Sequence, residues 1–300
     1  MKEEIIKKLK KEKLIEYLIK FFSLFSIMSL AAISLLLLYE SLPAFRETGF
    51  VAMFFGKEWY PTYDPASFGM LPLLWGSIFI TAISIIISAP LSLATAIYIH
   101  ELASPKIKKI LKPAIEILAS IPSVVYGLWG ATFLAPIVAK TFSLPIGFNA
   151  LTAGTVLAIM CIPIITTLCE DALNYVPVSF KEASYALGAN RWQTLVRVTV
   201  PAASSGIINA LILGIGRAIG ETMVVLMVSG GAAVISFSLF DPIRPITSAI
   251  ASEMGEASFG SLHYHTLFAA GFFLAVITLV LNIIAERFTE RFKVKLGKSR

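Results

Sequence analysis

Apolar residues occur along this chain in long, nearly unbroken runs instead of alternating with polar ones. Each of six runs is about 20 residues or longer, the length that a helix needs to cross roughly 30 Å of hydrocarbon. They lie near residues 18–38, 73–99, 114–139, 149–169, 204–230 and 266–285. The pattern predicts an all-α membrane protein with six transmembrane helices in a lipid bilayer.

Composition supports this fold class and limits the chemistry. Hydrophobic residues make up 57% of the chain and charged residues 15%, with a mean hydropathy of +0.81. The first run has a long basic flank and no small-residue cleavage site, so we expect it to remain as an anchor. Cys161 and Cys169 are the only cysteines, and we expect both to pack as small buried residues instead of forming a disulfide or a metal site.

The basic residues are concentrated in the termini and in alternate loops. Lysines and arginines gather before the first run, at 100–113, at 170–203 and after residue 286, whereas the loops at 40–71 and 234–265 hold few. The positive-inside rule then predicts that both termini lie in the cytoplasm. We expect a multi-pass protein of the inner (cytoplasmic) cell membrane. We divide the chain into an N-terminal segment with the first helix and an outer loop (1–72), a core (73–285) and a basic tail (286–300).

This topology separates the three histidines. His100 belongs to the cytoplasmic side, whereas His263 and His265 belong to the opposite one. They cannot share a metal site, and we expect the second pair to be solvated loop residues. The net charge of +6 follows the membrane topology, so it gives no indication of nucleic-acid binding.

The loop at 177–201 has the signals of two short helices joined by a turn. Ser179 and Glu182 have capping-box spacing for a helix from Phe180, and Gly188 can take the left-handed conformation that closes it. Asn190 and Gln193 repeat the capping arrangement for a second helix through Val198. Exposed apolar residues around Arg191 and Trp192 favour docking in a groove of a partner protein; a position on the membrane surface is the alternative.

The same loop resembles a family signature. Glu182, Ala183, Ser184, Gly188, Val198, Val200 and Pro201 match, in spacing, the E-A-A, three residues, G, nine residues, I-x-L-P motif of ATP-binding-cassette importer permeases. Serine at the third position and valine at both aliphatic positions are mild departures. The resemblance implies the type I importer (MetI-like) permease fold, with a cytoplasmic coupling helix in which Glu182, Ala183, Gly188, Arg191 and Trp192 face an ATPase.

The energy source must lie on another polypeptide. The chain has no G-x-x-x-x-G-K-[ST] segment to cradle ATP phosphates, so we predict that it is not an enzyme and binds no cofactor itself. The resemblance implies that ATP and Mg²⁺ bind to two partner ATPase subunits, and that a second permease subunit and an extracytoplasmic binding protein complete the importer.

Three further segments resemble a smaller group within these permeases. "WYPTYDPASFGMLPLLWGSI" (59–78), "IPSVVYGLWG" (121–130) and "GRAIGETMVVLMVSGG" (216–231) resemble the phosphate-specific permeases, the PstC type more than the PstA type. The resemblance implies import of inorganic phosphate, with a PstA-like second permease, PstB-like ATPases and a PstS-like binding protein as partners.

Two charges stand inside the fifth apolar run. Arg217 lies about 20 Å from the cytoplasmic edge if that helix starts near residue 204, and Glu221 lies one turn further. Charges at this depth should face the bundle or a water-filled path. Small residues at 206, 210, 214 and 218, and a second Gly-x-x-x-Gly at 216 and 220, predict close helix packing beside them.

The pair has two interpretations. Arg217 and Glu221, four residues apart on one helix, would form an ion pair that stabilises the bundle. Alternatively, Arg217 presents its guanidinium to phosphate along the substrate path and Glu221 holds it when the path is empty, which the resemblance favours.

Other functions remain open from the residues alone. The partner phosphate permease and an importer of another oxyanion are the nearest. An ATP-independent carrier would use the same buried charges for ion coupling, and an intramembrane enzyme is disfavoured because no nucleophile and base share a depth.

Overall fold

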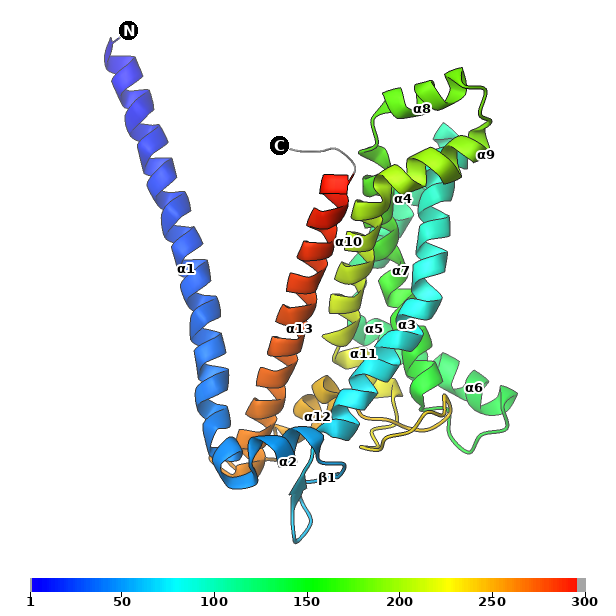
Figure 1. Ribbon diagram of the computed structural model, residues 1–300. Coiled ribbons are helices and arrows are strands. Elements are labelled where there is room, and N and C mark those ends of the chain that lie inside the picture. Colours follow the sequence, from blue (N-terminus) through cyan, green and yellow to red (C-terminus); the bar gives the residue numbers. More distant parts are fainter. Residues whose placement is uncertain (1, 296–300) are drawn as a thin grey trace.

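The computed structural model describes residues 2–295, and it is almost entirely helical there (Figure 1). Six of its helical segments are long and apolar enough to cross a membrane within these residues, which confirms the predicted number. They are Ile15–Thr48, Leu71–Leu102, Ser123–Thr141, Ala150–Asn174, Arg191–Ile219 and Leu262–Ile284.

Helix α7 (Ala150–Asn174) is the central helix of the bundle. It packs against α3 (Leu71–Ile97) and α10 (Val200–Ile219), and most of its apolar window is buried. A Cβ atom on Gly206 would lie 2.5 Å from the side chain of Ala172, and one on Gly214 would lie 2.6 Å from Ile165. The predicted close packing is confirmed at these two glycines, since only glycine lets α10 approach α7 so closely. It is wrong at Gly216 and Gly220, because a Cβ atom on Gly216 would meet nothing within 4 Å and one on Gly220 only the carbonyl oxygen of Gly216 at 3.5 Å.

The third span differs from the prediction. Residues 114–120 belong to a separate helix, α4 (Pro105–Ser120), and the span begins at α5 (Ser123–Trp129). It continues through a π-helical turn (Gly130–Leu134) into α6 (Ala135–Thr141). The break has a local cause: Pro122 favours extended backbone at Ile121, which has ψ 128° and ends α4.

The fifth span also differs, at both ends. It begins at α9 (Arg191–Thr194), passes through a π-helical turn (Leu195–Thr199) and enters α10 without a gap, so Pro201 does not separate the hairpin from the span. The wider turn directly precedes Pro201, whose ring is incompatible with a regular preceding turn. The predicted run to residue 230 is wrong as one helix, because α10 ends at Ile219 and α11 covers Met223–Val228.

A second apolar core lies at the end of the bundle away from the hairpin, here called the far end. It joins α2 (Phe50–Phe55), the strands β1 (Trp59–Tyr60) and β2 (Ser67–Phe68), and α12 (Ile246–Glu253). The strands pair antiparallel, with Trp59 opposite Phe68. This core makes the two long loops that were expected to face outward into structured elements, which position the residues described below.

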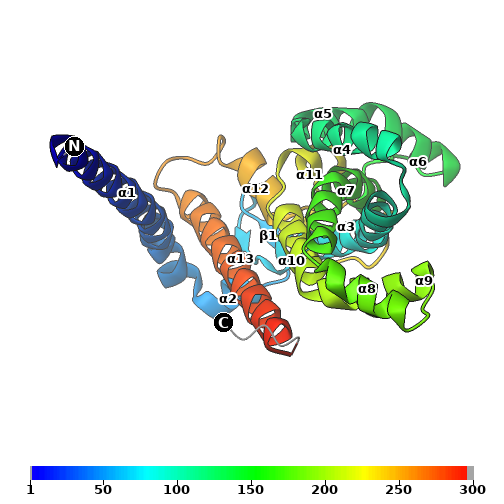
Figure 2. The same cartoon turned by 90° about the horizontal axis from the view of Figure 1, so that it is seen from above.

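Helix α1 (Lys2–Thr48) stands apart from the bundle and approaches it only near the far end (Figures 1 and 2). There, Phe45 packs against Phe273 of α13 (Leu262–Lys295). The start of α1 and the last turns of α13 lie at the same end as α8 (Val178–Ala186), called the hairpin end (Figure 1). Most of the predicted basic flank and tail lies in residues 1–12 and 288–300, whose side chains are outside the described part.

Candidate functional site

The break in span five lies at Gly220, where α10 ends and Glu221 and Thr222 lead into α11. The carboxylate of Glu221 accepts hydrogen bonds from the backbone N–H groups of Met223 (3.1 Å) and Val224 (3.3 Å). Glu221 is buried, and its carboxylate therefore caps the N-terminus of α11 in the interior of the protein. Its own carbonyl oxygen accepts a 2.7 Å hydrogen bond from the hydroxyl of Thr247 on α12.

Arg217 does not pair with Glu221. Within the residues that the structure describes, no ion pair joins the two side chains, and Arg217 is exposed on the surface of this chain. The predicted ion pair along one helix is wrong because the helix ends between the two residues. The structure places both at the same break, with Glu221 occupied as a cap and the guanidinium of Arg217 available to a ligand or a partner surface.

The hairpin at the hairpin end is built on Gly188. This glycine has φ +81°, as predicted, and closes α8 in a Schellman motif. The N–H of Ala189 donates to the carbonyl of Ser184 (3.2 Å), and the N–H of Gly188 donates to that of Tyr185 (2.9 Å). The hydroxyls of Ser184 and Thr194 also bond across the hairpin at 2.9 Å, so the turn and the two helices form one unit.

One of the two predicted capping boxes is present. Asn190 accepts from the backbone N–H of Gln193, and the Gln193 side chain accepts from that of Asn190, both at 2.9 Å. The other is absent: α8 begins at Val178 after Pro177, and no side-chain hydrogen bond caps it. Pro177, with its fixed φ, sets the start two residues earlier than predicted, which leaves the Glu182 side chain exposed.

The surface of the hairpin is apolar and hollowed. Ala183 is exposed, and three large side chains are among the exposed apolar ones, namely Leu187 at 89%, Trp192 at 66% and Phe180 at 48%. A groove of about 530 Å³ runs between the two helices and is lined by residues that include Ala183, Leu187 and Gly188. A surface of this kind suits contact with another protein.

Two cations of the hairpin converge on Glu101, at the end of span two. The ammonium of Lys181 on α8 pairs with the Glu101 carboxylate, and Arg191 on α9 donates to the Glu101 backbone carbonyl. Of these three residues, only Arg191 was among the candidate site residues predicted from the sequence, and the prediction was that it contacts a partner ATPase. Sequence reasoning missed Glu101 and Lys181 because they lie 80 positions apart.

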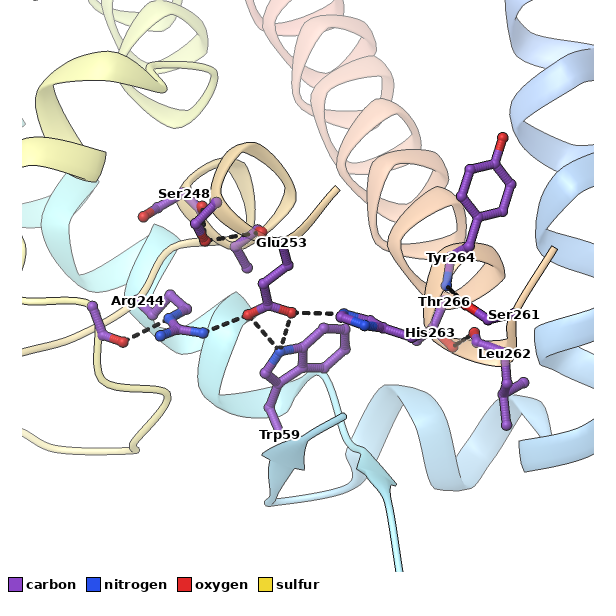
Figure 3. Close-up of polar contacts among 12 residues, drawn as sticks. Trp59, Arg244, Ser248, Glu253, Ser261, Leu262, His263, Tyr264 and Thr266 are labelled. Carbon is purple, nitrogen blue, oxygen red and sulfur yellow. Dashed lines mark hydrogen bonds and ion pairs between the residues drawn. The ribbon is translucent and has the colours of Figure 1, made fainter. Parts of the chain in front are cut away.

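A third polar site lies at the far end and surrounds Glu253 (Figure 3). Its carboxylate accepts from the indole N–H of Trp59 at 3.1 Å and from Nε2 of His263 at 2.9 Å, and it pairs with Arg244. Arg244 in turn donates to the carbonyl of Gly231 at 2.6 Å. We call these four side chains the Glu253 cluster. It joins β1, α12, α13 and the loop at 229–245, beside a cavity of about 500 Å³.

The three histidines form hydrogen bonds within the bundle, and the two cysteines are buried. His263 and His265 are partly buried, and Nδ1 of His265 bonds to the carbonyl of Glu40 at 2.8 Å, so the expectation of solvated loop residues is wrong. His100 lies at the other end of the bundle, against Asn174 and Lys181. Cys161 and Cys169 are free and buried, as predicted. The described residues contain no group of three or more side chains suited to a metal ion.

Solved structures of similar shape are importer permeases. A bacterial alginate ABC transporter, in complex with an alginate pentasaccharide-bound periplasmic protein, has a chain that matches with a TM-score of 0.66 and 17% identity, over 94% of this chain and 96% of that one. A chain of the inward-facing MetNI methionine ABC transporter matches with a TM-score of 0.59 and 19% identity, over 77% of this chain and 99% of that one. These similarities confirm the predicted type I importer permease fold.

Relatives in sequence are similar to this chain over nearly its whole length. YqgH of Bacillus subtilis (strain 168), named a probable ABC transporter permease protein, is 38% identical over 91% of this chain and 89% of its own. The phosphate transport system permease protein PstC of Pasteurella multocida (strain Pm70) is 34% identical over 93% and 92%. Residues 88–296 match the family described as binding-protein-dependent transport system inner membrane component. The chain belongs to this family of membrane permeases, and PstC proteins are among its relatives there.

Proposed function

We propose that this chain is the PstC-like transmembrane subunit of an ATP-driven importer of inorganic phosphate. The observation that carries this is the 34% identity to a PstC protein over more than nine-tenths of both chains. Members of the family are permease subunits and not enzymes, so hydrolysis of ATP, with its Mg²⁺, belongs to a separate ATPase.

The partners follow from the surfaces. The groove and exposed apolar residues of the hairpin fit a PstB-like ATPase, and two such subunits would serve the two permeases. A PstA-like permease would cover the face that carries Arg217, and a PstS-like binding protein would deliver phosphate at the far end. In this arrangement the hairpin end and both termini are cytoplasmic, consistent with the lysines and arginines there.

Arg217 is the residue that we assign to the substrate. Its guanidinium is exposed at the break in span five, and a planar fork of donors matches the oxygens of phosphate. Glu221 holds the break in shape by capping α11. Its role on the path is therefore to position Arg217, and it is not free to mask the guanidinium.

Phosphate uptake by cells that express the complete importer tests this assignment. Arg217→Gln should lower uptake at least about tenfold, since a charged hydrogen bond contributes roughly 1.5–3 kcal/mol, while the four kinds of subunit still co-purify. Arg287→Gln removes an exposed arginine in the last turns of α13, at the hairpin end and outside the hairpin itself, and should leave uptake unchanged.

Three other results would contradict the proposal in different ways. Loss of assembly in Arg217→Gln would assign Arg217 to packing between subunits. Uptake of a different oxyanion in place of phosphate would change the substrate, and uptake without an ATPase would indicate a secondary carrier.

A further inference from the structure

A continuous chain of side-chain hydrogen bonds runs across the hairpin end. Lys112 of α4 donates to Glu170 of α7 (2.7 Å), and Asn174 donates to the other oxygen of Glu170 (2.8 Å). Nδ1 of His100 lies 2.8 Å from the amide oxygen of Asn174, and the ammonium of Lys181 lies 2.9 Å from Nε2 of His100. Lys181 also pairs with Glu101, so the chain links α4, α7, the end of span two and the hairpin helix α8.

The two carboxylates and the imidazole of this hydrogen-bond chain are shielded from solvent, whereas Asn174 is exposed and Lys112 is partly exposed. The side chains of Glu170, His100 and Glu101 are 3%, 10% and 11% exposed. Hydrogen bonds that involve a charge are stronger than neutral ones, and more so away from water. Bonding to Glu170 raises the pKa of the Lys112 ammonium above its ordinary value, so both ends of the chain are anchored by charged groups.

The chemistry of the donors fixes the state of His100. An ammonium has only donors, so Nε2 of His100 must accept from Lys181 and carry no proton. The ring proton is then on Nδ1, where it is donated to Asn174, whose amide nitrogen donates to Glu170. Every hydrogen bond of the chain is satisfied only when His100 is neutral.

We propose that this chain of hydrogen bonds is the linkage through which movement of the hairpin reaches spans two and four and helix α4. The linkage is complete only when His100 is neutral. The inference rests on the proposed function, because it requires an ATPase that moves the hairpin. Lys181, His100 and Glu101 are positioning residues, since they act through the hairpin and touch no substrate.

Protonation of His100 would open the linkage. The groups that face or approach the ring are Lys181 from α8, Glu101 from its own segment, Asn174 from α7, Lys108 from α4 and Arg191 from α9. A proton on Nε2 would point at the Lys181 ammonium 2.9 Å away and at the Glu101 carboxylate 3.3 Å away. The imidazolium then competes with Lys181 for Glu101, which weakens the contact of α8 with span two and leaves the bond from Arg191 to the Glu101 carbonyl as the remaining one.

The test uses the complete importer in proteoliposomes, with phosphate uptake and ATP hydrolysis measured together. Lys181→Met should lower the number of phosphate ions carried per ATP about tenfold. The substitution removes both the hydrogen bond of the ammonium to His100 and its ion pair with Glu101. Lys181→Arg should restore most of the ratio. Lys109→Met is the matched control, since Lys109 is an exposed lysine of α4 outside the chain, and it should behave as the wild type.

The pH profile distinguishes this linkage from simple packing. Because the Lys181 ammonium lies 2.9 Å from Nε2, a second positive charge on the ring is disfavoured, and His100 should gain its proton only below the ordinary histidine pKa near 6.5. The wild-type ratio should therefore stay constant from about pH 7.5 to about 6.5 on the ATPase side and fall as the pH is lowered further, to about 5. His100→Gln can accept from Lys181 and donate to Asn174 throughout this range, so its ratio should stay constant.

An unchanged ratio in Lys181→Met, or a wild-type pH dependence in His100→Gln, would overturn the linkage and leave the proposed function standing. A wild-type complex that carries another oxyanion would overturn only the phosphate assignment, and the ratio would be measured with that anion. Failure of the wild-type chain to bind any ATPase would overturn both.

Discussion

Replacement of Gly188 tests whether the backbone conformation of the hairpin turn controls ATPase docking. Gly188 has φ +81°, and a Cβ atom built there would meet nothing within 4 Å. The effect of Gly188→Ala is therefore purely conformational within this chain. A side chain in the left-handed region costs roughly 1–2 kcal/mol, which corresponds to a factor of about 5–30 in the population of the native turn.

The same magnitude should appear in binding. If the ATPase recognises the native turn, the affinity of Gly188→Ala permease for the ATPase should fall by about 5–30-fold. Asparagine tolerates this conformation better than other non-glycine residues, so Gly188→Asn should lose only a few-fold. The measurement is titration of ATPase onto the permease pair held in nanodiscs. Gly255→Ala, at a position with negative φ and equally open space, should bind as the wild type.

Two results would refute this reasoning. Wild-type affinity in Gly188→Ala would mean that the turn relaxes without consequence for docking. Equal losses in the alanine and asparagine variants would mean that the partner excludes any side chain at this position, so that contact and not backbone conformation decides.

Two further predictions concern the other polar sites, and thermal unfolding of the purified protein in detergent checks both. Glu221→Ala removes the cap of α11 and should destabilise the protein by about 1 kcal/mol, whereas Glu221→Gln keeps one accepting oxygen and should lose less; equal losses would contradict the capping role. Glu253→Ala leaves Arg244 and the Trp59 indole without their acceptor and should cost about 3 kcal/mol. The exposed neighbour Glu256→Ala should change stability by less than about 0.5 kcal/mol, and a similar loss in both variants would mean that burial of the cluster is unimportant.

Local signals in the sequence were sufficient for several features. The turn at Gly188 and the capping box of Asn190 and Gln193 are determined by residues three or four positions apart, which is why the sequence predicts them correctly. The six spans follow from composition over about 20 residues. The start of α8 directly after Pro177 was also a local signal, but the capping spacing of Ser179 and Glu182 suggested a later start.

Features that depend on distant residues were not predictable from one sequence. The run from Ile207 to Val228 is apolar enough for one helix, yet it breaks at Gly220, where Thr247 bonds the Glu221 carbonyl from 26 positions away. The Glu253 cluster depends on Trp59, 194 positions away. A hydrophobicity pattern contains no information about such pairs, and the sequence therefore gives Arg217 a partner, Glu221, with which it forms no ion pair in the structure.

The junction between the hairpin and span five has a mechanical consequence. Arg191–Ile219 is one 29-residue helix, about 43 Å long at 1.5 Å per residue, with the hairpin residues Arg191 and Trp192 at one end and Arg217 near the other. Such a rod acts as a lever: a tilt of about 10° around its midpoint moves each end by roughly 4 Å, in opposite directions. An inward pull on the hairpin would thus swing the guanidinium outward without any intermediate part, and the π-helical turn at Leu195–Thr199 is the place where flexibility would reduce that stroke.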